Sequence, residues 1–319
     1  RMYNYRRTHV DWNTFYSLIA KANEIIALYP EGGNTDKEKG LIGQAYAVRG
    51  MAYYYLVQLY QNCVKADGTI NSDAPAVPMK LLAVEGATEE QIDAAMGRNT
   101  VKDLFNQIES DYSKAIENLQ NYAPESKNEI SLQVALGLQA RYYLLSQQWS
   151  KAEASARSAQ VGYTIMDEKG LQDGFMDISN SEWMWGFDHN TETQTTYASF
   201  FSMISSIAPG YAGLGYNTNL IDARLYGMMN DTDFRKQYWF NGPDGNNKYD
   251  SYGATLPYAN TKFGSDGNWT MDYVYMRAAE MVLIEAEALA RQGKNTEAAT
   301  ALKKLMAKRD PSWNMPSVS

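Results

Sequence analysis

The fold of this chain follows from one segment, Ala45-Tyr-Ala-Val-Arg-Gly-Met-Ala-Tyr-Tyr-Tyr-Leu-Val-Gln-Leu-Tyr60. Apolar and aromatic residues occupy every side of the helix that it predicts, so we expect this helix to be buried among other helices. Arg49 is the exception, because at helical spacing it shares a stripe with Ala45, Ala52 and Leu56. A buried guanidinium is costly unless a carboxylate or several carbonyls surround it. The segment therefore predicts an interior helix in which Arg49 anchors a buried ion pair.

Further helical patterns lie on both sides of this segment. Thr35 and Glu38 fit a capping box at the start of the same helix, and Thr100 fits the cap of a later one. In two predicted helix pairs, 131–147 with 150–160 and 272–292 with 296–308, the second helix is alanine-rich, and its small side chains let a neighbouring helix approach closely. Apolar periodicity predicts helices over 10–28, 35–62, 89–96, 100–119, 131–147, 150–160, 202–207, 220–229, 272–292 and 296–308.

Paired helices joined by short turns predict a mainly α fold, with a scaffold of tetratricopeptide-like helical hairpins and a loop-rich irregular insertion. We assign residues 1–162 and 271–310 to the scaffold and residues 163–270 to the insertion, packed on the scaffold as one unit. The insertion is rich in Gly, Asn, Asp and Tyr, and a loop-rich stretch of this length is usually functional. Within it, Trp183 and Trp185 alternate with Met184, which predicts a buried strand.

Composition excludes several classes of protein. The chain has 319 residues, 45% of them apolar, and a net charge of −8, which is typical of a globular protein. The acidic balance argues against a nucleic-acid partner, because phosphate binding needs a basic face. No apolar run reaches the ~18 residues of a membrane helix. The single cysteine, Cys63, cannot form an internal disulfide or a zinc cluster, and His9 and His189 have no helical partner histidine.

The residues favour a protein without catalytic activity or a resident cofactor. No nucleophile elbow, phosphate loop or dinucleotide fingerprint is present. Loop carboxylates such as Glu182, Asp188, Asp231 and Asp233 could pair as in a glycosidase, but capping and solvated roles are more common. The stretch from Asp244 to Asp250 has oxygen ligands at calcium-like spacing. It lacks the glycine and the closing glutamate of an EF-hand, so we favour an Asx-rich turn and leave calcium open.

The aromatic residues of the insertion are the best functional lead, because flat sugar faces stack on such rings while amide and carboxylate groups meet sugar hydroxyls. The chain has 24 tyrosines, seven tryptophans and nine phenylalanines, more than a helical core usually absorbs. The competing interpretation is that half or more of these rings pack the loops. The glycan-binding candidates are Tyr197, Tyr211, Tyr216, Trp239, Tyr252, Trp269 and Asn246.

A second arginine lies in the predicted helix over 272–292. Arg277 and Glu280 are three residues apart, so they are expected to form an ion pair on one helix face. A glutamate of the same helix could instead hold Arg49. In either arrangement a structural role is favoured over a catalytic one.

The segment from Ala45 to Tyr60, followed by Val77 and Pro78, resembles the signature of the SusD/RagB family of glycan-binding outer-membrane lipoproteins of Bacteroidetes. Further matches follow in the family's order and cover nearly the whole chain. They are Trp12 to Asn23, Arg98 to Asp111, Ala135 to Leu145 with Arg141, Glu182-Trp-Met-Trp, Asp233-Phe-Arg235 and Met276 to Ala288.

The resemblance implies a non-catalytic protein of the outer membrane, exposed at the cell surface, that binds oligosaccharide or polysaccharide. It implies delivery of the glycan to a SusC-like TonB-dependent transporter, and membrane attachment only through a lipid anchor that this chain lacks. We expect the chain to be a fragment without the family's N- and C-terminal ends. The motif residues Arg49, Asp111 and Arg277 are expected to be structural. The alternative is a helical-repeat scaffold that binds peptide or protein only.

Overall fold

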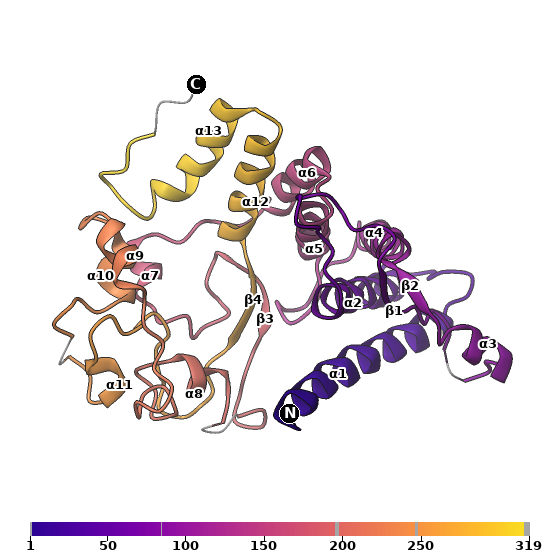
Figure 1. The fold of residues 1–319 in the computed structure, drawn as a ribbon, viewed down its shortest axis with the longest axis horizontal. Coiled ribbons are helices and arrows are strands. Elements are labelled where there is room, and N and C mark those ends of the chain that lie inside the picture. Colours follow the sequence, from indigo (N-terminus) through magenta and orange to yellow (C-terminus); the bar gives the residue numbers. More distant parts are fainter. Residues whose placement is uncertain (1, 84, 195–197, 246–247, 316–319) are drawn as a thin grey trace. The chain divides into compact units, whose positions relative to one another are not determined.

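The computed structural model describes residues 2–83, 85–194, 198–245 and 248–315. The chain divides into two compact units, each described by itself (Figure 1). Unit 1 comprises Arg1–Glu125 and Glu129–Ala159, and unit 2 comprises Ser126–Asn128 and Gln160–Ser319. The elements of unit 1 are α1 (Met2–Ala27), α2 (Asp36–Tyr60), β1 (Pro75–Pro78), α3 (Glu89–Ala94), β2 (Arg98–Thr100), α4 (Val101–Asn118), α5 (Leu132–Leu145) and α6 (Trp149–Ala159).

Unit 2 combines short helices, one strand pair and a helical hairpin. Its elements are α7 (Glu168–Leu171), β3 (Trp183–Phe187), α8 (Phe200–Ile204), α9 (Ala223–Met228), α10 (Phe234–Trp239), α11 (Tyr252–Thr255), β4 (Tyr273–Arg277), α12 (Ala278–Arg291) and α13 (Asn295–Met306). The predicted fold class is confirmed: the described chain is mainly α, with stacked helical hairpins and a loop-rich part. The assignment of 1–162 with 271–310 to one scaffold and of 163–270 to an insertion stays a prediction.

Unit 1 is a stack in which each of α1, α2, α4, α5 and α6 packs on the next. The predicted capping box of α2 is present, since Thr35 accepts from the Glu38 backbone and Glu38 accepts from the Thr35 backbone. Glycine lets α4 approach α2 closely. A Cβ on Gly43 would lie 2.7 Å from the Leu119 side chain, and a Cβ on Gly50 would lie 3.0 Å from the Tyr112 ring.

Arg49 is buried, and its ion-pair partner is Asp111 of α4. Its Nε and Nη2 donate to the two Asp111 carboxylate oxygens at 3.0 and 2.7 Å, and its Nη1 donates to the Asn23 side-chain oxygen at 2.8 Å. The alternative prediction, that a glutamate of the segment 272–292 holds Arg49, was therefore wrong. The apolar periodicity of α4 places Asp111 on the buried face beside α2, and this proximity is absent from local sequence spacing.

The Arg49 pair also fixes the loop after β1. Asn23, whose oxygen accepts from Arg49, donates from its amide nitrogen to the Lys80 and Leu82 carbonyls, each at 3.1 Å. The Tyr53 hydroxyl donates to the Lys80 carbonyl at 2.8 Å. One buried cation thus connects α1, α2, α4 and the loop that follows β1.

Replacing Arg49 by Met should lower the free energy of unfolding by about 3–5 kcal/mol, because the Asp111 carboxylate would stay buried without its cation. Urea denaturation measures the loss. Lys151→Met is the matched control: this lysine pairs with Glu109 at 2.8 Å on the surface, and its loss should cost no more than about 1 kcal/mol. Equal losses in the two variants would contradict a special role of the buried pair.

In unit 2, the predicted helix over 272–292 begins later than expected. Tyr273–Arg277 form β4, which pairs antiparallel with β3, and α12 starts at Ala278. The helical prediction was wrong for this stretch because its Tyr and Val residues suit a strand and find a partner far away in sequence. The predicted strand at Trp183 and Trp185 is confirmed as part of β3.

The late start of α12 changes the partner of Arg277. Its backbone is extended, with φ −131° and ψ 148°, so Glu280 is not one helical turn away on the same face. Arg277 instead pairs with Glu182 at 2.7 Å, and the expected pairing with Glu280 was wrong. Glu182 is completely buried and also pairs with Arg309 at 3.0 Å. The ion pair therefore joins the start of β3 to the end of β4.

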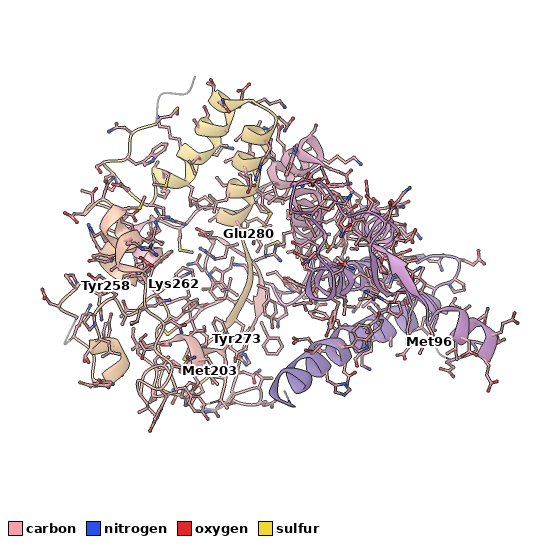
Figure 2. All side chains as sticks on the ribbon, viewed as in Figure 1. Met96, Met203, Tyr258, Lys262, Tyr273 and Glu280 are labelled. Carbon is pink, nitrogen blue, oxygen red and sulfur yellow. The ribbon has the colours of Figure 1, made fainter. Side chains whose placement is uncertain are left out.

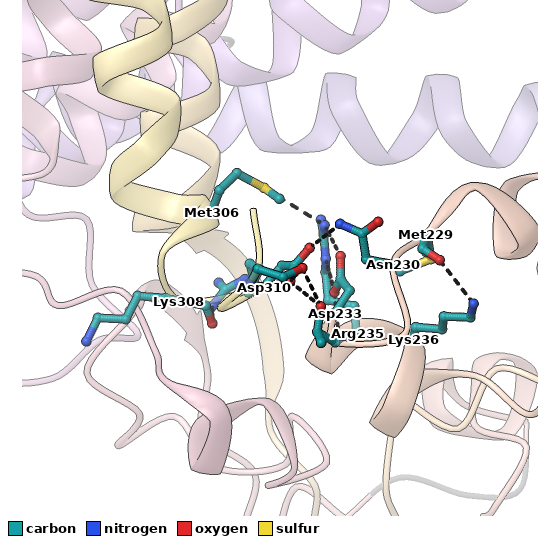
Figure 3. Close-up of polar contacts among 11 residues, drawn as sticks. Met229, Asn230, Asp233, Arg235, Lys236, Met306, Lys308 and Asp310 are labelled. Atoms are coloured by element: carbon teal, nitrogen blue, oxygen red, sulfur yellow. Dashed lines mark hydrogen bonds and ion pairs between the residues drawn. The ribbon is translucent and has the colours of Figure 1, made fainter. Parts of the chain in front are cut away.

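The segment after α13 is tied to the loop before α10 by polar contacts (Figure 3). Asp310 accepts from the Asn230 amide at 2.7 Å and from the Thr232 hydroxyl at 2.6 Å. Burial raises the pKa of Asp310, but these two hydrogen bonds and those from Ser312 outweigh it and lower the pKa to about 2. The Asp310 carboxylate thus stays ionised and holds the end of the helical hairpin.

Candidate functional site

Two of the predicted glycan-binding tyrosines are exposed and lie close together in unit 2. The side chain of Tyr216 is 78% exposed and that of Tyr252 is 64% exposed. A Cβ on Gly215 would lie 2.6 Å from Cδ1 of Tyr252, so the Tyr252 ring rests against the backbone next to Tyr216. We call Tyr216, Gly215 and Tyr252 the tyrosine surface. Tyr211, a third candidate, is half-buried in the same loop.

The loop that presents Tyr216 is fixed by the end of α8. Ser202 is buried, and its hydroxyl and carbonyl oxygens accept from the backbone N–H groups of Tyr211 and Ala212 at 3.0 and 2.8 Å. The Tyr216 N–H then donates to the Tyr211 carbonyl at 3.0 Å, which closes the loop. Gly215 has φ +85°, a conformation that side chains rarely adopt.

The helix that presents Tyr252 is fixed on the same loop. The Gly253 N–H donates to the Gly213 carbonyl at 2.6 Å. The buried Asn241 side chain donates to the Ala254 and Leu256 carbonyls at 2.6 and 3.0 Å. The backbones that carry both exposed rings are therefore hydrogen-bonded to the rest of the unit, so little backbone freedom is lost when a ligand binds there.

The tyrosine surface suits stacking on the flat face of a ligand. Two aromatic rings with hydroxyl groups offer apolar faces and polar edges at once.

One predicted candidate is excluded by burial. Trp239 is only 8% exposed, its Nε1 donates to the Leu171 carbonyl at 2.7 Å, and its ring packs on Phe175 at 5.5 Å. The assignment of Trp239 to the glycan site was wrong, because this residue ends helix α10 and turns into the core of unit 2. The Gly- and Asp-rich sequence around it concealed that short helix.

Trp269 belongs to a different loop and stays a prediction. It is half-buried, with φ +60°. The Asp266 carboxylate accepts from the backbone N–H groups of Asn268, Trp269 and Thr270 at 2.8–3.1 Å, which holds the tight turn. A non-glycine residue in this conformation is strained, and such strain is frequent at functional sites.

Two candidates, Tyr197 and Asn246, lie outside the described residues. The possible calcium loop from Asp244 to Asp250 includes Asn246 and Asn247, so it is not tested. In the described part of the chain, no group of three or more His, Cys, Asp and Glu side chains is placed to hold a metal ion. None of the described helices combines the length and the apolar character needed to cross a membrane.

Sequence reasoning missed the glycines that position the tyrosines. Gly213 and Gly215 allow the loop to pass beneath α11, and a Cβ on Gly213 would lie 1.9 Å from the Ala208 carbonyl oxygen. The Gly-Leu-Gly spacing before Tyr216 was the available signal, since glycine beside an exposed ring indicates a close backbone approach.

Comparisons with known proteins agree with this architecture. Residues 2–144 match a family model described as starch-binding associating with outer membrane, and residues 180–309 match the model of the SusD family. The chain belongs to the SusD/RagB family. A search of the curated proteins found no match.

Three similar solved structures share the fold of this SusD/RagB chain. A SusD-like carbohydrate binding protein from Bacteroides vulgatus has 24% identity and a TM-score of 0.79, with 97% of this chain and 63% of that chain covered. A SusD superfamily protein from Bacteroides thetaiotaomicron has 19% identity, a TM-score of 0.76 and coverages of 94% and 66%. A laminarin-binding SusD-like protein has 18% identity, a TM-score of 0.67 and coverages of 93% and 70%. The chain thus spans less than two thirds of the first two.

Replacing Gly215 by Ala should displace the Tyr252 ring as well as strain the backbone. Gly267→Ala is the matched control, because Gly267 has φ +75° with no atom within 4 Å of a new Cβ. We expect the control to lose about 1–2 kcal/mol of unfolding free energy from the positive φ alone. Gly215→Ala should lose more and should change the fluorescence quenching of Tyr252 by iodide, with Tyr252→Phe as reference. The same loss and no quenching change would contradict the packing of Tyr252 on Gly215.

Proposed function

We propose that this chain binds oligosaccharide or polysaccharide, without catalysis, through the tyrosine surface. The observation that supports the proposal is the pair of exposed rings, Tyr216 and Tyr252, on a hydrogen-bonded loop and helix. Membership of the SusD/RagB family adds support, because the model matched by residues 2–144 describes starch binding and a structural neighbour binds laminarin.

The finer part of the proposal concerns the cell. In the parent protein the chain would be displayed at the outer membrane through a lipid anchor. It would pass its glycan to a SusC-like TonB-dependent transporter. The family description, association with the outer membrane, supports this placement. Co-purification of the full-length protein with such a transporter from native membranes tests it.

Replacing both Tyr216 and Tyr252 by Ala should weaken glycan binding by roughly 10–100-fold, because each stacked ring contributes about 0.5–1.5 kcal/mol. Affinity electrophoresis against a panel that includes starch and laminarin finds the ligand, and calorimetry then measures the loss. Tyr55→Ala is the matched control, since Tyr55 is a partly exposed tyrosine of α2 in unit 1. If the folded protein binds no glycan in the panel, the proposal fails.

One observation favours the alternative function, a scaffold that binds peptide or protein only. A cavity of about 100 Å³ lies between the loop Lys80 to Ala83 and α3. Its apolar surroundings include Leu82 and Ile92, which are 52% and 41% exposed, and α3 has no buried residue. Binding of an apolar peptide by a folded protein that binds no glycan in the panel would support this alternative.

A further inference from the structure

Lys262 is a cation surrounded by aromatic rings in the core of unit 2 (labelled in Figure 2). Its Nζ lies 4.6 Å from the ring centroids of Phe175 and Trp239 and 5.0 Å from that of Phe263. Rings attract a cation through their faces but offer it no hydrogen-bond acceptor of the strength of a carboxylate. The ammonium group is thus sheltered but not neutralised.

The Lys262 side chain makes no hydrogen bond or ion pair with any described residue. Lys262 is nevertheless only half-buried. Part of this side chain therefore meets solvent.

The charges around Lys262 leave a surplus of cations. The one carboxylate that attracts it, Glu182, is already engaged by Arg277, Arg309 and the Met166 N–H. Burial, followed by the positive charges of Arg277 and Arg309, lowers the pKa of Lys262 to about 7, and the attraction of Glu182 only partly opposes this.

The backbone holds Lys262 in this place from both sides. The Thr261 N–H donates to the Trp239 carbonyl, and the Gly264 N–H donates to the Gly174 carbonyl, each at 2.8 Å. The two glycines make a close crossing, because a Cβ on Gly174 would lie 3.0 Å from Cα of Gly264. Phe175, whose ring is one of those beside the Lys262 ammonium, has φ +53°. Strain of this kind persists only where the surroundings impose it.

We propose that Lys262 is the binding site for an anionic group, a carboxylate or a sulfate, that enters from solvent and supplies the missing acceptor. A charge-assisted hydrogen bond to the ammonium would form where the described residues provide no acceptor. Assigning that group to an acidic sugar of the bound glycan rests on the proposed function. The anion site itself stands on the geometry of Lys262 and its neighbours.

The test is calorimetry on the full chain with glucuronate, glucose 6-sulfate and glucose at matched ionic strength. We expect one or both anionic sugars to bind and glucose to bind at least roughly tenfold more weakly. The two anionic probes separate a carboxylate from a sulfate ligand. Binding should be tighter at about pH 6 than at about pH 8.5, because a lysine with a lowered pKa loses its proton between them.

Lys262→Met should abolish the preference for the anionic sugar. Lys236→Met is the matched control. Lys236 also lies over a ring, that of Tyr226 at 4.8 Å, but donates to Asp231 at 2.6 Å and to the Met229 carbonyl at 3.0 Å (Figure 3). It therefore has acceptors already, and its loss should leave anion binding unchanged.

Folding of Lys262→Met can be judged from its stability. The unfolded lysine keeps its proton up to its ordinary pKa of 10.5, whereas the folded one loses it near pH 7. The unfolded state thus binds more protons in this window, and wild-type stability should rise with pH from about 7 to about 10.5. The variant lacks this rise and should be the more stable protein at neutral pH.

Equal anion binding by wild type and Lys262→Met, or no binding of either anionic sugar, would overturn the proposal. Failure of the proposed function is distinguishable. Anionic sugars that bind at Lys262, with no glycan bound at Tyr216 and Tyr252, would leave the anion site standing and remove the tyrosine surface. If neutral glycan binds equally to wild type and Lys262→Met and no anionic sugar binds, the tyrosine surface stands and the anion site falls.

Discussion

The buried ion pair between Arg49 and Asp111 is the constraint on which unit 1 depends. A guanidinium 5% exposed faces a carboxylate with no exposure at all, so each charge is tolerable only while the other is in place. The geometry meets this demand with two parallel hydrogen bonds and a third to Asn23. Through Asn23 the pair fixes the loop after β1, so the packing of three helices and one loop is a single arrangement.

Unit 2 also depends on buried ion pairs, but here the buried cations outnumber the carboxylate that they share. Glu182 is shared by Arg277 and Arg309, which joins β3, β4 and the segment after α13 around one buried carboxylate. Because that carboxylate is already paired, Lys262 lies among aromatic rings with no acceptor among the described residues. A surplus of buried cations in the core and exposed tyrosines on the loops are two separate features of this unit. We assign the first to an anionic group and the second to the flat face of a sugar.

The sequence was most informative where structure is local or periodic. The capping box at Thr35 and the apolar stripe of α4 were sufficient to predict two of the stacked helices. It was least informative where a residue's partner is far away in the chain. Arg277 could be assigned to Glu280 only by helical spacing, because the pairing of β4 with β3, which makes Glu182 its partner, has no local signal.

The candidate site was predictable only in part, for the same reason. The aromatic residues of 163–270 could be recognised as a group, but exposure depends on tertiary packing. Tyr216 and Tyr252 are exposed beside Gly215, while Trp239, in an equally polar stretch, is buried against Leu171 and Phe175. Trp239 is the last residue of the short helix α10, and Tyr252 is the first residue of the short helix α11. Sequence periodicity revealed neither helix.

Hydroxyl-radical footprinting, with and without a saturating glycan, tests the proposal that a glycan covers the tyrosine surface. We expect protection of Tyr216 and Tyr252, with unchanged oxidation of Met228, which is 82% exposed elsewhere in the same unit. Unchanged oxidation of both tyrosines under saturation, or protection confined to the helices of unit 1, would contradict it.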